Sequence, residues 1–327
     1  MSEAFRHVDR ERTIVFGAGA LDDAADLLGE GYTLLTTARA SGSAPGLAER
    51  AAAVVHVPAG PVDVVAADLL AAVGGDRLVA LGGGRVIDVA KALAAADGPR
   101  DVAALPTSLA GAEMTGVHRH ALGVADSTPK VRPSLVVNDP ALSASQPTDQ
   151  LAASSANAHG HAVTALVSER STAIARAVAA EAITALAAGW SGDEPGRSKV
   201  ALGALLAGWA VDHSGLGPHH ALAQTAVRMA SLEHAHVNAA LLPLTVAAMR
   251  ARDRVAFERL ELALARPVEA FADELRLRAG VAGLGQLGAD AELLDRTVAA
   301  AAKRGELARV TPALERDEVA AIYRAAA

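Results

Sequence analysis

The first 105 residues of this 327-residue chain alternate between short apolar segments and segments with helical periodicity, and this alternation restricts the possible folds most strongly. Alternating strands and helices form right-handed crossovers, which give a mostly parallel sheet covered by helices on both faces. The segments that predict strands are 12–17, 32–37, 54–57, 78–81 and 102–105, with a last strand over 135–140. The segments that predict the helices between them are 21–28, 46–53, 62–73 and 86–93.

Three consecutive glycines follow the apolar segment 78–81 and precede a helical segment. Glycine has no side chain to keep a ligand from the backbone, and a helix start presents free N–H groups and a positive dipole. This turn therefore favours phosphate. A tight turn without a ligand is the alternative interpretation, because short glycine motifs have many false positives. Ligands of parallel sheets bind beyond the carboxyl ends of the strands, where the glycines and residues 106–108 both lie.

The second half of the chain has a different pattern. From about residue 147 onward no segment is typical of a strand, and the segments that predict helices are 150–167, 173–188, 199–211, 219–230, 236–249 and 254–265. We therefore predict an α/β plus all-α chain. An N-terminal Rossmann-like parallel-sheet domain over residues 1–144 binds a nucleotide, and an all-helical domain over residues 145–327 carries the substrate or metal site. We expect the cofactor in the cleft between them.

Composition excludes several classes of function. The net charge of −7, the 2% aromatic content and the lack of a basic block disfavour nucleic-acid binding. The absence of cysteine excludes disulfides, iron–sulfur clusters and thiol nucleophiles. The apolar segments 200–211 and 238–249 are too short to span a membrane, and the first residues lack the apolar segment of a signal peptide. We expect a cytoplasmic protein without a membrane partner.

Histidines accumulate in the helical half, where seven of the eleven lie between residues 159 and 236. A lone histidine on an apolar helix is usually structural, but a group of them favours a site, because histidine binds metals and transfers protons near neutral pH. Asn157 and His161 are four residues apart and project from one helix face. The residues that we expect in a catalytic site are Asn157, His161, His219, His220 and His234.

The order of the motifs resembles the iron-containing (group III) alcohol dehydrogenase superfamily, and within it the maleylacetate reductase branch. The family's Gly-Gly-Gly-Ser-x-x-Asp-x-x-Lys is similar to residues 82–91, and its Pro-Thr-Thr-x-x-Gly-Ser-Glu-x-Thr is similar to residues 106–115. The other similar segments are Asp139-Pro-x-Leu142, residues 155–166, the pair His219-His220, and residues 234–243. The resemblance runs from about residue 15 to residue 243.

The resemblance implies a dehydroquinate synthase-like fold and a nicotinamide cofactor, NADH or NADPH. In the family the glycine loop holds the pyrophosphate and the Pro-Thr-Thr segment contacts the cofactor. The expected strand end near the ribose carries Arg39 and no acidic residue, which slightly favours NADPH. The residues that we expect to bind the cofactor are Gly82, Gly83, Gly84, Arg85, Asp88, Thr107, Ser108 and Arg39.

In the family an Asp and three His hold a divalent iron or zinc. The corresponding positions here are Asn157, His161, His220 and His234. A neutral amide is a weaker ligand than a carboxylate, and maleylacetate reductases, which also carry Asn there, are regarded as able to work without metal. We therefore expect a metal-free pocket whose histidines orient substrate carboxylates and supply a proton. A metal-dependent alcohol dehydrogenase is the alternative, with these four residues as ligands.

Several positions depart from the family pattern. Arg85 replaces the loop serine, Ser108 and Ala112 replace Thr and Ser, Gln224 replaces a histidine, and a family lysine falls at Ala125. Lys130, five residues further along the chain, is a candidate to replace that lysine. We expect a reductase that delivers hydride to an activated C=C or C=O of a small carboxylated substrate, as a homodimer. A fold used for non-redox chemistry or binding is a further alternative.

Overall fold

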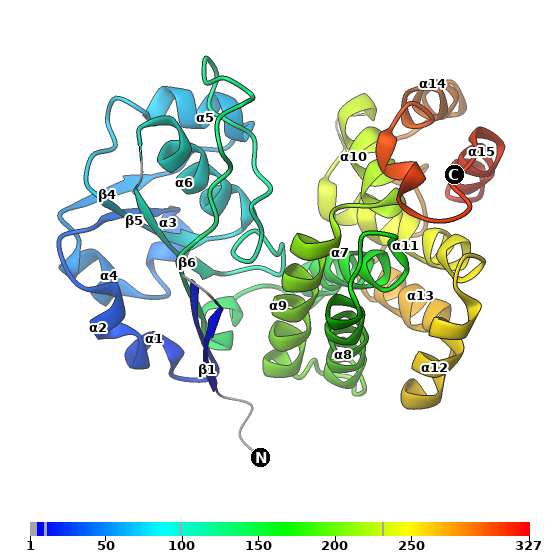
Figure 1. Ribbon diagram of the computed structural model, residues 1–327, viewed down its shortest axis with the longest axis horizontal. Helices are drawn as coiled ribbons and strands as arrows, with labels where there is room; N and C mark the ends of the chain where they lie inside the picture. Colours follow the sequence, from blue (N-terminus) through cyan, green and yellow to red (C-terminus); the bar gives the residue numbers. More distant parts are fainter. Residues whose placement is uncertain (1–4, 10–11, 99, 231) are drawn as a thin grey trace. The chain divides into compact units, whose positions relative to one another are not determined.

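The computed structural model describes residues 5–9, 12–98, 100–230 and 232–327. The chain divides into two compact units, residues 1–146 and 147–327, which are described separately below (Figure 1). Within the described residues no helix is both long enough and apolar enough to cross a membrane.

A seven-stranded sheet forms the centre of the first unit, in the order β1-β2-β7-β6-β5-β3-β4. All neighbouring strands are parallel except β1 and β2. The strands are β1 (Phe5–Asp9), β2 (Arg12–Phe16), β3 (Thr33–Thr36), β4 (Ala53–His56), β5 (Arg77–Gly82), β6 (Asp101–Pro106) and β7 (Leu135–Asn138). The six predicted strands and the mostly parallel sheet are confirmed. The antiparallel strand β1 was not predicted.

Helices cover both faces of this sheet because alternate strand residues point to opposite sides. Leu78 and Ala80 of β5 pack in one core with α5 and α6, whereas Val79 and Leu81 pack in the other with α1, α2 and α4. The helices are α1 (Ala20–Asp23), α2 (Ala25–Leu28), α3 (Ala38–Ser41), α4 (Pro45–Arg50), α5 (Val62–Leu69) and α6 (Gly84–Ala96), followed by the 3-10 helix η1 (Pro140–Ser143).

One predicted helix of this unit is divided into two in the structure. Residues 21–28 form two four-residue helices, because the backbone at Ala24, with φ −94° and ψ 2°, leaves the helical region between them.

The second unit is entirely helical in its described residues. Its helices are α7 (Thr148–Val167), α8 (Ala173–Gly189), α9 (Arg197–Ser214), α10 (Pro218–Ala230), α11 (His234–Arg250), α12 (Arg254–Leu264), α13 (Val268–Arg278), α14 (Ala291–Ala301), the 3-10 helix η2 (Gly305–Arg309) and α15 (Arg316–Ala325). The first six were predicted, with ends that differ by a few residues, and the last three were not. The predicted fold class, a parallel α/β part followed by a helical part, is confirmed.

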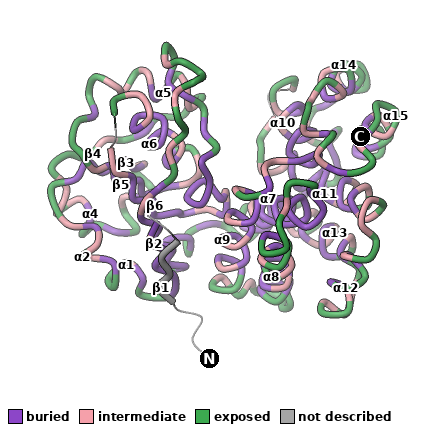
Figure 2. Tube along the Cα trace, in the orientation of Figure 1, coloured by how far each residue is buried: buried purple, intermediate pink, exposed green. Residues whose placement is uncertain are grey.

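Helix α7 is the centre of the second unit. Most of its residues are buried, and α8, α9, α11 and α13 pack around it (Figure 2). Polar side chains on α7 are therefore placed inside the unit, where each needs a hydrogen-bond partner.

Candidate functional site

The residues expected to bind a cofactor lie at the carboxyl ends of the strands of the first unit's sheet, which we call the cofactor edge. Strands β3, β5 and β6 are parallel neighbours, so the segments after their carboxyl ends lie side by side. Arg39 follows β3, Gly82–Gly84 end β5 and begin α6, and Thr107 and Ser108 follow β6. The N–H of Thr107 donates to the carbonyl of Gly82 at 3.0 Å, which joins the two motifs directly.

The three glycines are required by close packing. A Cβ atom on Gly82 would lie 2.6 Å from Val86, one on Gly83 would lie 3.1 Å from the hydroxyl of Ser108, and one on Gly84 would lie 2.8 Å from Ala110. None of them has a positive φ. The missing side chains therefore bring the residue 107–110 segment against the glycine loop.

This loop also fits a phosphate. Gly83 caps α6 without a side-chain hydrogen bond, and the first N–H groups of a helix have no partner within the helix. Gly83 and Gly84 are partly exposed and Arg85 is exposed, so an anion can reach the helix start. Arg39 is exposed as well. The residues present fit the pyrophosphate of a nucleotide.

Asp88, which was expected to bind the cofactor, is paired with the buried Lys91. Lys91 is fully buried, and its Nζ donates to the carbonyls of Ala112 at 2.8 Å, Thr115 at 3.0 Å and Val117 at 2.9 Å. Its fourth partner is Oδ1 of Asp88 at 2.7 Å. Burial raises the pKa of Asp88, and the charge of Lys91 opposes this shift. The carboxylate expected to contact the cofactor is therefore already paired with a lysine.

Two further motif residues hold the chain together. The carboxylate of Asp139 accepts hydrogen bonds from the N–H groups of Gly19 at 3.0 Å and Ala141 at 2.9 Å, so it joins the turn after β2 to η1. Lys130, considered as a substitute for the family lysine, donates to the carbonyl of His118 at 2.7 Å.

The second unit brings four of the five expected catalytic residues into direct contact. The rings of His161 and His220 stack with centroids 4.2 Å apart and planes at 18°. The ring of His219 meets that of His220 edge to face at 5.0 Å. His220 Nε2 lies 3.2 Å from Asn157 Oδ1. Helices α7 and α10 supply these residues, and all four are buried.

His234 is the exposed member of the group. It begins α11, which packs on both α7 and α10. Its own pKa is lowered by burial, and in its protonated form it also lowers the pKa of His161, His219 and His220.

We call the cluster of His161, His219, His220 and His234 the imidazole group. Burial keeps its rings neutral. Loss of hydration, with a smaller contribution from neighbouring histidines, lowers the pKa of His161 to about 3 and that of His219 to about 4. Burial also lowers the pKa of His220 well below its usual value. At neutral pH these three rings therefore act as neutral hydrogen-bonding groups.

Two residues that support this group were not predicted. Oγ1 of Thr245 lies 2.8 Å from Nδ1 of His219, and Gly160 leaves the space in which the His219 ring lies. Thr245 is 26 residues from His219 in the chain, so only the packing of α11 on α10 reveals the pair. Gln224, at the position of a family histidine, accepts a hydrogen bond from Arg304 at 3.1 Å.

The arrangement does not fit a metal ion. Among the described residues, no three His, Asp or Glu side chains are placed to hold one ion together. Lone pairs of imidazole lie in the ring plane, so the stacked rings of His161 and His220 do not point at a common centre. Nε2 of His220 is also occupied by the Asn157 amide oxygen.

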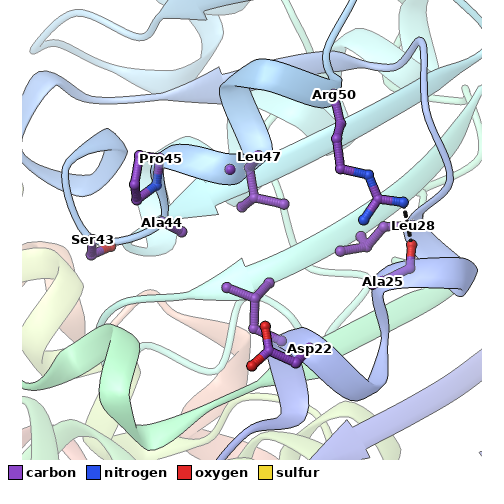
Figure 3. Close-up of a pocket in the computed structure, with 10 residues that line it drawn as sticks. Asp22, Ala25, Leu28, Ser43, Ala44, Pro45, Leu47 and Arg50 are labelled. Atoms are coloured by element: carbon purple, nitrogen blue, oxygen red, sulfur yellow. Dashed lines mark hydrogen bonds between the residues drawn. The ribbon is translucent and has the colours of Figure 1, made fainter.

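The first unit also contains a pocket that none of the expected cofactor residues lines. It has a volume of about 340 Å³ and lies between helices α1–α2 and α4 (Figure 3). Arg50 lines it and donates to the carbonyl of Ala25 at 2.8 Å. No residue of the predicted site lines this pocket, whose walls are Leu21, Asp22, Ala25, Leu28, Ser43, Ala44, Pro45, Gly46, Leu47 and Arg50.

Comparison with known proteins gives consistent similarities. Residues 151–327 match the Fe-containing alcohol dehydrogenase family, C-terminal. Maleylacetate reductase from Sphingobium indicum is 33% identical over 256 residues, which cover 72% of this chain and 72% of that protein. Maleylacetate reductase 2 from Cupriavidus pinatubonensis is 34% identical over 207 residues, which cover 58% of this chain. The chain spans about half of that relative's length, 55%.

A solved structure is similar over the whole chain. The crystal structure of maleylacetate reductase from Agrobacterium tumefaciens has a TM-score of 0.83 and 26% sequence identity, and the match covers 100% of this chain and 98% of that chain.

Proposed function

Because the chain belongs to the Fe-containing alcohol dehydrogenase family, we propose that it is a nicotinamide-dependent reductase that delivers hydride to an activated C=C or C=O of a small carboxylated substrate without a metal. The resemblance to this family and to its maleylacetate reductase branch is confirmed, and so is the expectation of an oxidoreductase. The substrate, the independence from metal, the homodimer and the cytoplasmic location remain predictions.

The cofactor edge of the first unit supports this proposal. The N–H groups of Gly83 and Gly84 bind the pyrophosphate, and the Ser108 hydroxyl lies beside them. Arg85 and Arg39 are exposed cations at the same edge, and Arg39 favours the 2′-phosphate of NADPH over NADH. The bound nicotinamide supplies a hydride, and the chain's part is to orient it.

The imidazole group of the second unit supports the substrate part of the proposal. Neutral His219 and His220 donate and accept hydrogen bonds, so they orient a carboxylated substrate and exchange a proton with it. His234 is exposed, so its ring adds a hydrogen-bonding group that solvent can reach. The observation that carries the metal-free assignment is the hydrogen bond of His220 Nε2 to Asn157 Oδ1, because the amide oxygen takes up one of the two ring nitrogens with which His220 could bind a metal.

Titration of the purified protein with NADPH and NADH, followed by nicotinamide fluorescence, tests the redox assignment. We expect saturable binding, tighter for NADPH, and oxidation of the bound nucleotide at 340 nm when maleylacetate or a related unsaturated keto acid is added. Gly83→Val is the matched variant, because its side chain would press on Ser108 and cover the helix start. Failure of both nucleotides to bind would favour the non-redox alternative.

A further inference from the structure

Two buried cations hold the segment that follows β6, residues 107–117. This segment forms neither helix nor strand, so its buried carbonyls lack the partners that regular structure provides. Lys91 of α6 binds the carbonyls of Ala112, Thr115 and Val117. Nη1 of Arg12 in β2 also donates to the carbonyl of Met114 at 2.8 Å.

The two cations act on the backbone only a few residues from the cofactor edge. Thr107 and Ser108 begin the same segment, and its N-terminal end is tied to the glycine loop by the hydrogen bond from Thr107 to Gly82. Ser108 and Ala110 contact the space next to Gly83 and Gly84. The position of these contacts therefore depends on how firmly the rest of the segment is held.

The segment has a built-in electrostatic cost. Glu113 is 1% exposed, and its Oε2 is buried without a hydrogen-bond partner in the described part of the chain. A buried carboxylate without full hydrogen bonding destabilises the arrangement around it. Burial raises the pKa of Glu113, and the charges of Lys91 and Arg12 partly oppose this shift, so the same cations that bind the carbonyls also compensate this side chain.

We infer that Lys91 and Arg12 are positioning residues for the cofactor site. They hold residues 112–117 in place, so that Thr107 and Ser108 remain at the glycine loop. Neither cation needs to touch the nucleotide, because Lys91 is fully buried and its Nζ already has four partners. This inference rests on the proposed function, since its readout is the affinity for a nicotinamide nucleotide.

Loss of the Lys91 cation is expected to lower the affinity for the nucleotide rather than the rate of hydride transfer. Without the Lys91 ammonium, three carbonyls and the Asp88 carboxylate lose their partner, and the segment samples other conformations. The apparent Kd rises by the inverse of the fraction of molecules that remain competent, so a segment in place one-tenth of the time gives an increase of about tenfold. At saturating nucleotide kcat changes little, and KM for the nucleotide rises.

Lys91→Met is the main test variant, because methionine has a similar length and no charge. Arg77→Met is its matched control. Arg77 also binds two carbonyls, those of Leu27 and Leu28, and pairs with Asp101. It begins β5, so it lies at the amino end of that strand, opposite the cofactor edge. Both variants lose cation–carbonyl bonds, and only Lys91→Met acts on residues 107–117.

The measurement combines the Kd for NADPH, from fluorescence titration, with hydrogen exchange of the amides of residues 107–117. We expect Lys91→Met to raise Kd about tenfold and to speed exchange in this segment, while Arg77→Met changes neither. Arg12→Gln tests the second cation and serves if Lys91→Met does not fold, with a smaller rise of Kd expected.

An unchanged Kd and unchanged exchange in Lys91→Met, or in Arg12→Gln if the first variant does not fold, overturn the inference. An equal rise of Kd in Arg77→Met overturns it as well, because the effect is then one of general stability. Failure of the unmodified protein to bind NADPH or NADH contradicts the proposed function instead, and the exchange measurement still reports whether the cations hold the segment.

Discussion

Nε2 of His220 lies 3.2 Å from Oδ1 of Asn157, so the amide stands as a hydrogen-bond partner of the imidazole at a position where the family has a carboxylate ligand. This contact satisfies Nε2 of His220, whereas its Nδ1 is buried without a hydrogen-bond partner among the described residues. The stacked ring of His161 completes the arrangement. We propose that the amide of Asn157 and the stacking of the two rings together disfavour a metal ion.

Asn157→Asp is expected to increase the affinity for Zn²⁺. The new carboxylate brings a negative charge beside the two stacked imidazoles, and anionic oxygen is a better metal ligand than an amide. Elemental analysis after dialysis against Zn²⁺ measures the effect, with Asn157→Gln as the neutral control. Stoichiometric zinc in the unmodified protein and in the Gln variant would show that the amide does not exclude the metal.

Gly160→Ala is expected to lower kcat/KM at least tenfold and to destabilise the protein by about 1–3 kcal/mol through overpacking. The new methyl group would overlap the ring of His219, which must then turn away from Thr245 Oγ1. Gly305→Ala is the control in the same unit, because a Cβ there meets no atom within 4 Å. The steady-state rate with NADPH gives the comparison, and equal rates in both variants would remove His219 from the site.

Sequence patterns predicted the local parts of this molecule well. The run 78–81, the glycines and the helical periodicity after them lie within 20 residues, so the β5–α6 turn could be recognised. The four-residue spacing of Asn157 and His161 likewise placed them on one face of α7. Such features depend on neighbours along the chain, and the structure confirms the elements that carry them.

Long-range pairs could not be predicted in this way. The partners of Lys91 could not be predicted, because three of the four are carbonyls 21 to 26 residues further along an irregular segment. Strand β1 was missed because only its antiparallel pairing with β2 defines it. Thr245 was missed for the same reason, since its partner His219 lies on another helix.

Glu113→Gln is expected to stabilise the protein at pH 8 but not at pH 5. Burial raises the pKa of Glu113 from 4.5 to about 7, so the folded chain holds this proton more tightly than the unfolded chain. Stability is therefore lost as the pH rises from about 4.5 to about 7, and above that range the loss is complete.

The glutamine variant avoids this loss and should gain on the order of 1–3 kcal/mol at pH 8. Thermal unfolding at a series of pH values measures the difference, with the exposed Glu49→Gln of α4 as control. A gain that does not depend on pH would assign the effect to packing instead of ionisation.

Asp139→Ala is expected to destabilise the first unit by about 1–3 kcal/mol. The carboxylate caps both the turn at Gly19 and the helix η1 through Ala141, and no other side chain of the described residues caps α1. Urea unfolding followed by circular dichroism measures the change, with the exposed Asp149→Ala at the start of α7 as control. A shift no larger than that of the control would show that water replaces the carboxylate.

The rate of NADPH oxidation by metal-stripped protein tests the central claim most directly. After treatment with EDTA and confirmation of metal removal by elemental analysis, the protein should reduce maleylacetate or a related unsaturated keto acid as fast as the untreated protein. Added Zn²⁺ or Fe²⁺ should leave this rate unchanged. Activity that disappears with the metal and returns with Zn²⁺ or Fe²⁺ would contradict a site in which Asn157 and the histidines act without an ion.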